Sequence, residues 1–410
     1  MKDGAAKASG YRWVVLAVFM LLTAASQVAW ITFAPITGEA AAFYGTSDLV
    51  IGLLSLVFMA VYVVMFLPAA WAIDTWGFRP AVGVGAVLTA AGCLARGLFA
   101  ASLPLVFAGQ IAIAVGQPFL LGAITKLAAR WFPTGERATA SGLGTLSMYL
   151  GILAGIMATP LLAHRFGMRG MLLAWGILAV AAAAAFLAFA RERPRTPVGE
   201  PGEETRTLMF DGLRSMLRQK DFILLAVIFF VGLGVFNGVT TWIEAIVRPR
   251  GFDSSQAGMA GGLMLIGGIV GAAIVPLVSD AVRRRKPFIV LALAGLLPGL
   301  AGVTFARGYG LLLASSFVFG FFLLSSGPVG FQYGAEITLP APEGTSNSLL
   351  IVMGQVSGIV CIFTMDALKA ADGSMTASLA VLIGLMAACV LLSLFLGESP
   401  IAKAGAPSDG

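Results

Sequence analysis

The sequence predicts an all-α membrane protein whose twelve transmembrane helices form two pseudo-symmetric six-helix bundles. Three observations predict this fold. First, 59% of the 410 residues are apolar and only 11% are charged, whereas soluble domains are about a quarter charged. Second, twelve apolar runs are long enough to cross a bilayer, and third, the two halves of the chain repeat each other. The composition excludes a soluble enzyme, a disordered chain and a nucleic-acid-binding protein, because lipid must be the main solvent.

The twelve apolar runs define the predicted spans. Each is close to the ~20 residues that a helix needs to cross the hydrocarbon core. None alternates with a period of two, as a β-barrel strand would, and the 51 glycines favour closely packed membrane helices. The spans are Trp13–Ile36, Leu49–Ala72, Pro80–Ala100, Leu103–Ala128, Ala138–Leu162, Met171–Ala190, Phe222–Ile246, Ala257–Val278, Phe288–Phe305, Leu311–Tyr333, Ser346–Ala367 and Ala377–Gly397.

The distribution of Lys and Arg predicts the orientation. With both termini in the cytoplasm, 19 of the 26 basic residues fall on the cytoplasmic side, as the positive-inside rule requires. Lys2 and Lys7 precede a long first helix without a small-residue cleavage site, so we expect no removable signal peptide. Short loops and the lack of a glycosylation sequon favour the inner membrane of a bacterium.

A polar segment after the sixth span divides the chain. We expect bundles at residues 1–190 and 221–410, joined by a cytoplasmic linker at 191–220. Within the linker, apolar residues among basic ones suit either a short amphipathic helix on the inner leaflet or a solvated connector. These apolar residues are Leu208, Met209, Leu213, Met216 and Leu217.

The repeat is clearest at the ends of the second and eighth spans. Asp74, in Ala70-Trp-Ala-Ile-Asp74-Thr-Trp-Gly77-Phe-Arg79, lies 206 residues before Asp280, in Pro276-Leu-Val-Ser-Asp280-Ala-Val-Arg-Arg284. Similarly, Glu136 in Pro133-Thr-Gly-Glu136-Arg lies 207 residues before Glu343 in Pro340-Ala-Pro-Glu343-Gly. A constant offset over this length indicates a duplicated six-helix unit.

Twelve helices in two repeats, with an acidic and basic cluster after the second helix of each, resemble the major facilitator superfamily. The signature of that loop is roughly Gly-x-x-x-Asp-Arg/Lys-x-Gly-Arg-Arg/Lys; the first half has Ala70 for its leading glycine, and the second half keeps Asp280 and a basic run without the glycine. We expect a breakable latch there, which pairs the two halves in one conformation only. The expected gate residues are Asp74, Gly77, Arg79, Glu136, Arg137, Asp280, Arg284 and Glu343.

In such repeats, substrates bind between the halves near the bilayer midplane. At ~1.5 Å per helical residue, Gln117, Tyr149, Asn237 and Gln355 fall near the middle, and Trp30 lies somewhat further outward. We therefore expect these five residues to bind the substrate. The alternatives are an interfacial anchor for Trp30 and a bond to a neighbouring helix for Gln117.

No charged residue is expected at this depth. Glu244 and Asp366 lie near the outer ends of their helices, and Arg96 and Lys126 lie near opposite membrane faces. A neutral, zwitterionic or cationic solute and facilitated diffusion fit this lining best. Glu244 and Asp366 leave proton coupling open, so the alternative is a proton-coupled exporter of hydrophobic cations. A non-transporting membrane receptor is the third hypothesis.

A narrower resemblance extends over most of spans 1–5 and 7–11. Ser26-Gln-Val-Ala-Trp30-Ile-Thr-Phe33, Gln117-Pro-Phe-Leu-Leu-Gly122 and Gly330-Phe-Gln-Tyr-Gly-Ala-Glu336-Ile-Thr-Leu-Pro340, followed by Gln355-Val-Ser-Gly358, resemble the feline leukaemia virus subgroup C receptor family of solute carriers. In that family, a tryptophan of helix 1 and a tyrosine of helix 7 form an aromatic cage for choline, beside a glutamine of helix 11.

The resemblance implies that Trp30 and Gln355 contact the substrate, through cation–π attraction and an amide hydrogen bond. Asn237 stands where the family has its tyrosine. Half of the aromatic cage is therefore absent unless Tyr149 supplies the second ring. The implied substrate is therefore a small organic solute, choline-like, ethanolamine-like or vitamin-like.

The remaining chemistry-bearing residues predict no catalysis. Cys93, Cys361 and Cys389 lie in separate apolar runs, and His164 is the one histidine, so we expect neither a metal site nor a nucleophile with a base. We expect no cofactor, no nucleic-acid partner and a monomer in the lipid bilayer.

Overall fold

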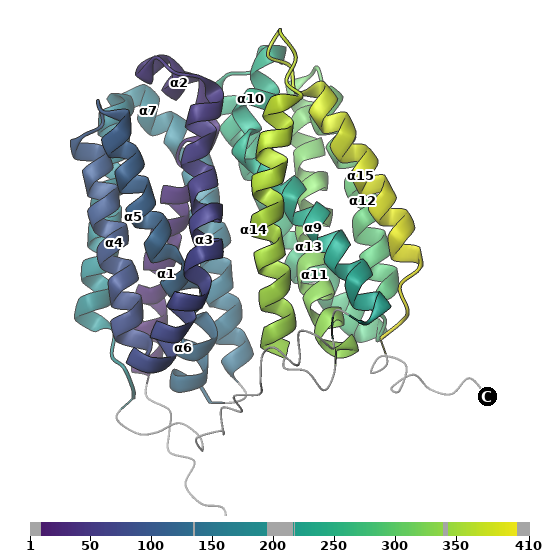
Figure 1. Ribbon diagram of the computed structural model, residues 1–410, viewed down its shortest axis with the longest axis horizontal. Helices are drawn as coiled ribbons and strands as arrows, with labels where there is room; N and C mark the ends of the chain where they lie inside the picture. Colours follow the sequence, from purple (N-terminus) through teal and green to yellow (C-terminus); the bar gives the residue numbers. More distant parts are fainter. Residues whose placement is uncertain (1–9, 134–135, 195–215, 217, 339–342, 400–410) are drawn as a thin grey trace, which may run out of the picture. The chain divides into compact units, whose positions relative to one another are not determined.

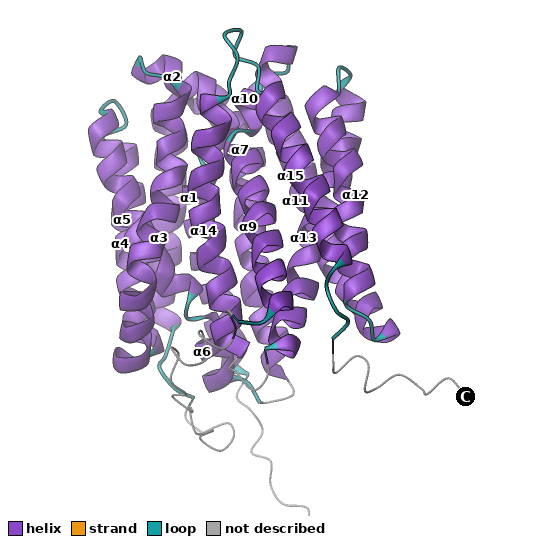
Figure 2. Ribbon diagram, turned by 45° about the vertical axis from the view of Figure 1, so that its right-hand side comes forward, coloured by secondary structure: helices purple, strands orange, loops and turns teal. Residues whose placement is uncertain are grey.

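The structure, a computed structural model, describes residues 10–133, 136–194, 216, 218–338 and 343–399. The chain divides into two compact units, Met1–Glu203 and Glu204–Gly410. The described residues of each unit form a bundle of long helices (Figure 1), joined by turns and loops (Figure 2). Most of the predicted amphipathic segment of the linker, at residues 208–217, lies outside the described residues.

The first unit contains the helices up to residue 189. The contacts of α7 with α1 and α4, and of α5 with α4 and α3, hold it together. Its elements are α1 (Tyr11–Ile31), η1 (Ala34–Ile36), α2 (Thr37–Tyr44), α3 (Asp48–Trp76), α4 (Phe78–Leu98), α5 (Leu103–Leu121), α6 (Ile124–Trp131) and α7 (Arg137–Phe189).

The second unit repeats this pattern. Helix α13 packs against α11 and α12, and α14 packs against α9. Its elements are α9 (Lys220–Thr241), α10 (Ile243–Val247), η3 (Arg248–Arg250), α11 (Ser254–Val282), α12 (Lys286–Phe305), α13 (Tyr309–Ile337), α14 (Glu343–Ala367) and α15 (Thr376–Leu394).

Eleven helical segments of the described chain are long and apolar enough to cross a membrane. The twelve predicted spans fit into these eleven because α7 contains two of them, Ala138–Leu162 and Met171–Ala190. Inside α7, Gly167 has a non-helical backbone with φ of 69°. This left-handed conformation suits glycine, which has no Cβ, and it marks where the fifth span ends and the sixth begins.

In each unit the first long helix is interrupted near its C-terminal end. Helix α1 ends at Ile31 and is followed by η1 and α2, while α9 ends at Thr241 and is followed by α10 and η3. Pro35 follows Ile31 by four residues and has no N–H to donate to the Ile31 carbonyl. Breaking a helix leaves its last carbonyls without intrahelical partners, so other groups must satisfy them.

Helices α4 and α5 approach each other closely at paired glycines. A Cβ added to Gly85 would lie 2.8 Å from the carbonyl oxygen of Gly116, and a Cβ on Gly116 would lie 2.9 Å from the carbonyl oxygen of Gly85. Small residues at such a crossing let the two backbones touch, which favours helix association in lipid.

Replacing Gly85 by alanine is therefore expected to destabilise the first unit. The new Cβ would meet backbone, which cannot move aside cheaply, so we expect a loss of about 2 kcal/mol. The check is the thermal unfolding midpoint in detergent. Gly142→Ala is the matched control, because a Cβ there meets no described atom within 4 Å; an equal loss in both variants would contradict the crossing argument.

Candidate functional site

Trp30 lies one residue before the end of α1, next to the interruption. Its side chain is buried, with 7% of its surface exposed. The Trp30 carbonyl, which is among the last four of the helix, accepts a hydrogen bond from Ser55 Oγ of α3 (3.5 Å). Two residues earlier, the Val28 carbonyl accepts from Thr32 Oγ1 (2.6 Å). Side chains thus satisfy the carbonyls around Trp30.

Gln117 and Tyr149 share a level of the first unit that differs from the level of Trp30. Gln110 of α5 reaches the Ala29 carbonyl, and Gln117 follows it by seven residues, about 10 Å along the helix. Tyr149 lies two residues before Gly151, which packs against Ala24 of α1. Both residues therefore lie roughly 10 Å from the level of Trp30 along the helix axes. A ring cage between Trp30 and Tyr149 would have to span about two helical turns.

Asn237 and Gln355 lie together in the second unit. The buried side chain of Asn237, on α9, donates from Nδ2 to the Gly354 carbonyl of α14 (3.3 Å). Gln355 is the next residue and is partly exposed. One turn earlier in α9, Gly234 lets this helix approach Ser357 of α14. The structure thus brings these two predicted residues to one level on adjacent helices, with one amide bonded to backbone and the other exposed in part.

Three polar residues near Trp30 escaped the sequence analysis as site candidates. Arg96 and Gln110 are fully buried and are hydrogen-bonded to the Ala29 carbonyl. Gln27 lies three residues before Trp30, 3% exposed, and its Nε2 has no hydrogen-bond partner among the described residues. The sequence did contain a signal for Gln27, because residues three apart, such as Gln27 and Trp30, lie on the same face of a helix. Arg96 could not be placed, since its helix-end position suggests exposure at a membrane face.

Two of the predicted gate residues of the first unit, Asp74 and Glu136, form ion pairs within that unit. Lys126 Nζ of α6 contacts Asp74 Oδ1 at the end of α3 (2.7 Å) and donates to the Ile73 carbonyl (2.8 Å). Glu136 pairs with Arg12 of α1 (3.0 Å). Arg137 Nε donates to the Phe132 carbonyl (3.2 Å). These contacts tie the ends of α1, α3 and α6 together.

Glu192, which the sequence analysis did not select, caps the start of α4. Its carboxylate accepts from the backbone N–H of Phe78 (3.0 Å) and of Arg79 (2.6 Å), where a negative group also stabilises the helix dipole. Gly77, with φ of 98°, lets the carboxylate approach. Arg130 forms an ion pair with Glu192, and Arg79 donates to the Leu187 carbonyl (3.1 Å).

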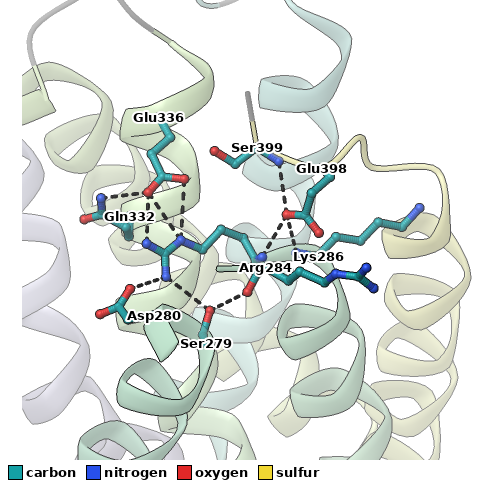
Figure 3. Close-up of polar contacts among 9 residues, drawn as sticks. Ser279, Asp280, Arg284, Lys286, Gln332, Glu336, Glu398 and Ser399 are labelled. Atoms are coloured by element: carbon teal, nitrogen blue, oxygen red, sulfur yellow. Dashed lines mark hydrogen bonds and ion pairs between the residues drawn. The ribbon is translucent and has the colours of Figure 1, made fainter. Parts of the chain in front are cut away.

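A corresponding cluster at the turn between α11 and α12 is centred on Arg285. Figure 3 labels its partners Ser279, Asp280 and Glu336. Its guanidinium contacts Glu336 of α13 (3.0 Å) and also pairs with Asp280. Burial lowers the pKa of the Arg285 guanidinium, but hydrogen bonds to Glu336 and Asp280 outweigh burial and raise it overall. Arg284, the predicted gate residue, is exposed; its carbonyl accepts from Ser279 Oγ (2.6 Å).

Glu398 caps α12 as Glu192 caps α4. It accepts from the backbone N–H of Arg285 (2.8 Å) and of Lys286 (3.2 Å), and it follows Glu192 by 206 residues. This is the same offset that separates Asp74 from Asp280. The repeat therefore extends to the capping carboxylates, in both cases from the segment that follows the last long helix of the unit.

The two candidate coupling acids differ in burial. Glu244 of α10 is 3% exposed and pairs with Arg248 one turn later (3.3 Å). Asp366, near the end of α14, is partly exposed. Glu343 begins α14, but its side chain lies outside the described residues.

The sequence profile of the Major Facilitator Superfamily matches residues 15–362. The chain belongs to this superfamily. It is 31% identical over 392 residues to solute carrier family 49 member A3 of Danio rerio, covering 91% of this chain and 82% of that protein. It is 30% identical over 417 residues to the choline/ethanolamine transporter FLVCR1 of Felis catus, covering 95% of this chain and 72% of that protein. These matches confirm the predicted resemblance to the major facilitator superfamily and to the feline leukaemia virus subgroup C receptor family.

Solved structures confirm the predicted fold. A bacterial homologue of the lysosomal transporter Spinster matches with a TM-score of 0.75 and 16% identity, over 97% of this chain and 96% of that one. The D-xylose–proton symporter matches with a TM-score of 0.72 and 14% identity, over 97% and 99%. The chain is thus an integral membrane transporter of a small molecule, and its relatives are transporters rather than enzymes.

Proposed function

We propose that this member of the superfamily carries a small organic amine of the choline or ethanolamine type by facilitated alternating access. The supporting observation is the buried Trp30 at the interrupted end of α1, in a chain 30% identical to a choline/ethanolamine transporter. The face of an indole attracts a quaternary ammonium without needing a carboxylate, by about 2 kcal/mol when water is excluded.

The fully buried guanidinium of Arg96 does not conflict with a cationic substrate. It lies against the Ala29 carbonyl, at the negative end of the α1 dipole. Its Nη1 donates both to this carbonyl and to Gln110 Oε1, so two oxygens offset part of its positive charge.

The wider arrangement belongs to the same proposal. Trp30, Gln117 and Tyr149 of one bundle (1–190) and Asn237 and Gln355 of the other (221–410) line the substrate path, and the linker 191–220 joins the bundles. The gate comprises Asp74, Gly77, Arg79, Glu136, Arg137, Asp280, Arg284 and Glu343. The protein works as a monomer in a bacterial inner membrane, with both termini in the cytoplasm.

Uptake into proteoliposomes tests the proposal. Radiolabelled choline or ethanolamine is expected to enter until its concentrations are equal on both sides, with no further accumulation when a proton gradient is imposed. Protein-free liposomes are the control. Accumulation driven by the pH gradient would show proton coupling through groups such as Glu244 or Asp366, and uptake of pyridoxine alone would replace the amine by a vitamin-like substrate.

A further inference from the structure

The interrupted end of α1 is held by a buried arginine from another helix. Arg96, near the C-terminal end of α4, is 0% exposed. Its Nη1 donates to the Ala29 carbonyl (3.1 Å), the residue before Trp30. Its Cζ lies 6.0 Å from the ring centroid of Phe33, just beyond the end of α1. One guanidinium thus contacts α1 on both sides of the interruption.

Gln110 of α5 completes this contact. Its Oε1 accepts a hydrogen bond from Arg96. Its Nε2 donates to the Leu54 carbonyl of α3 (2.9 Å) and, at 3.4 Å, to the Ala29 carbonyl. Four helices, α1, α3, α4 and α5, therefore meet in one buried hydrogen-bonded network beside Trp30. Such a network fixes a geometry more strictly than apolar packing does, because each member must keep its partners.

The space for this network exists because Gly109 has no side chain. A Cβ on Gly109 would lie 2.8 Å from Arg96 Cγ. The second unit has neither residue at the equivalent positions. Gly302 and Ser316 stand there, 206 residues after Arg96 and Gln110. There Gly302 faces Ser315, the counterpart of Gly109. The same helix pair thus packs in the second unit without an arginine, so the fold itself does not require one.

The guanidinium also carries a cost that a purely structural residue would avoid. Its hydrogen-bond partners in the described chain include no carboxylate, and its Nε has no partner there. Buried charges of this kind are replaced by apolar residues without loss of stability when only packing matters. The network contacts the carbonyl adjacent to Trp30, so it can fix the position of this part of α1.

We infer that Arg96, together with Gln110, is a positioning residue that holds the interrupted end of α1 and thereby orients Trp30 for substrate. This inference rests on the proposed role of Trp30 in binding. Arg96 acts through α1 and does not itself contact the substrate. Its loss therefore weakens binding more than it slows the conformational cycle.

Hydrogen exchange of the detergent-solubilised full chain tests the clamp without any substrate. In Arg96→Gln, amides of residues 29–36 are expected to exchange about tenfold faster, because local opening no longer breaks the network. Arg96→Lys keeps the positive charge but loses the planar guanidinium with its several donors, so we expect a smaller increase in the exchange rate. Arg250→Gln is the control, since its acceptors, the carbonyls of Ile246, Thr304 and Ala306, lie in the second unit. Unchanged exchange in Arg96→Gln would overturn the inference.

Two further readouts test the link to Trp30. The emission of Trp30, obtained by subtracting the spectrum of Trp30→Phe, is expected to shift to the red in Arg96→Gln as the indole meets water. For choline uptake, KM is expected to rise about tenfold while Vmax per folded protein stays within about twofold. Faster exchange with unchanged emission and KM would overturn the positioning role. If Trp30→Ala transports normally, the proposed binding site fails, whereas the exchange result still decides the clamp.

Discussion

Trp30→Ala is expected to lower the transport of a quaternary amine strongly, measured per folded protein. The substitution removes the aromatic face and its cation–π attraction, so Vmax/KM for choline should fall at least about tenfold. Trp30 is buried beside the end of α1, and the carbonyls around it are satisfied independently of its ring. Initial rates of choline uptake into proteoliposomes, normalised to folded protein, are the measurement.

Trp71→Ala is the matched control for this prediction. Trp71 belongs to the same unit, but it is 60% exposed on α3, whereas Trp30 is buried. We expect its removal to leave uptake close to that of the unaltered protein. Normal uptake by Trp30→Ala, or an equal loss in both variants, would exclude an aromatic site at Trp30.

Arg285→Ala is expected to cause the largest loss of stability. It leaves the carboxylate of Glu336, whose side chain is 5% exposed, without its guanidinium partner. Breaking a buried ion pair from one side costs about 3–5 kcal/mol, because the remaining charge is desolvated and unpaired. The thermal unfolding midpoint in detergent should fall accordingly.

A double variant separates the loss of the pair from the loss of the side chain. Replacing both partners by leucine, in Arg285→Leu/Glu336→Leu, should recover most of the stability, since no buried charge then stays unpaired. Asp280, the other acidic partner of Arg285, has a side chain that is 60% exposed and therefore stays hydrated. Arg284→Ala is the neighbouring control, because Arg284 is exposed. A double variant no more stable than Arg285→Ala would show that the ion pair is not the cause.

The sequence pattern was sufficient to predict the fold, because a lipid bilayer places simple requirements on the segments that cross it. A spanning segment must be apolar over about 20 residues and must satisfy its own backbone, so composition and length predict helices. The duplication was equally visible, since Asp74 and Asp280 are 206 residues apart and Glu136 and Glu343 are 207 residues apart. The interruption of α1 was less visible: Pro35 indicates a break, but the predicted span ran on to Ile36.

The contacts at the site could not be predicted in the same way. The sequence selected Trp30, Gln117, Tyr149, Asn237 and Gln355 by depth, and depth alone does not say which residues meet. The structure sets Gln117 and Tyr149 roughly two turns from Trp30 and bonds Asn237 to the backbone beside Gln355.

By itself, the sequence determined that this chain is a duplicated bundle of membrane helices that carries a small solute. The tertiary structure decided how the chain meets the cost of breaking a helix inside lipid. Arg96 suggested an exposed helix end, yet its guanidinium lies on the Ala29 carbonyl, 67 residues away in the chain. Only folding brings a broken helix and its distant partner together, because unsatisfied carbonyls in lipid recruit donors from whichever helices pack beside them.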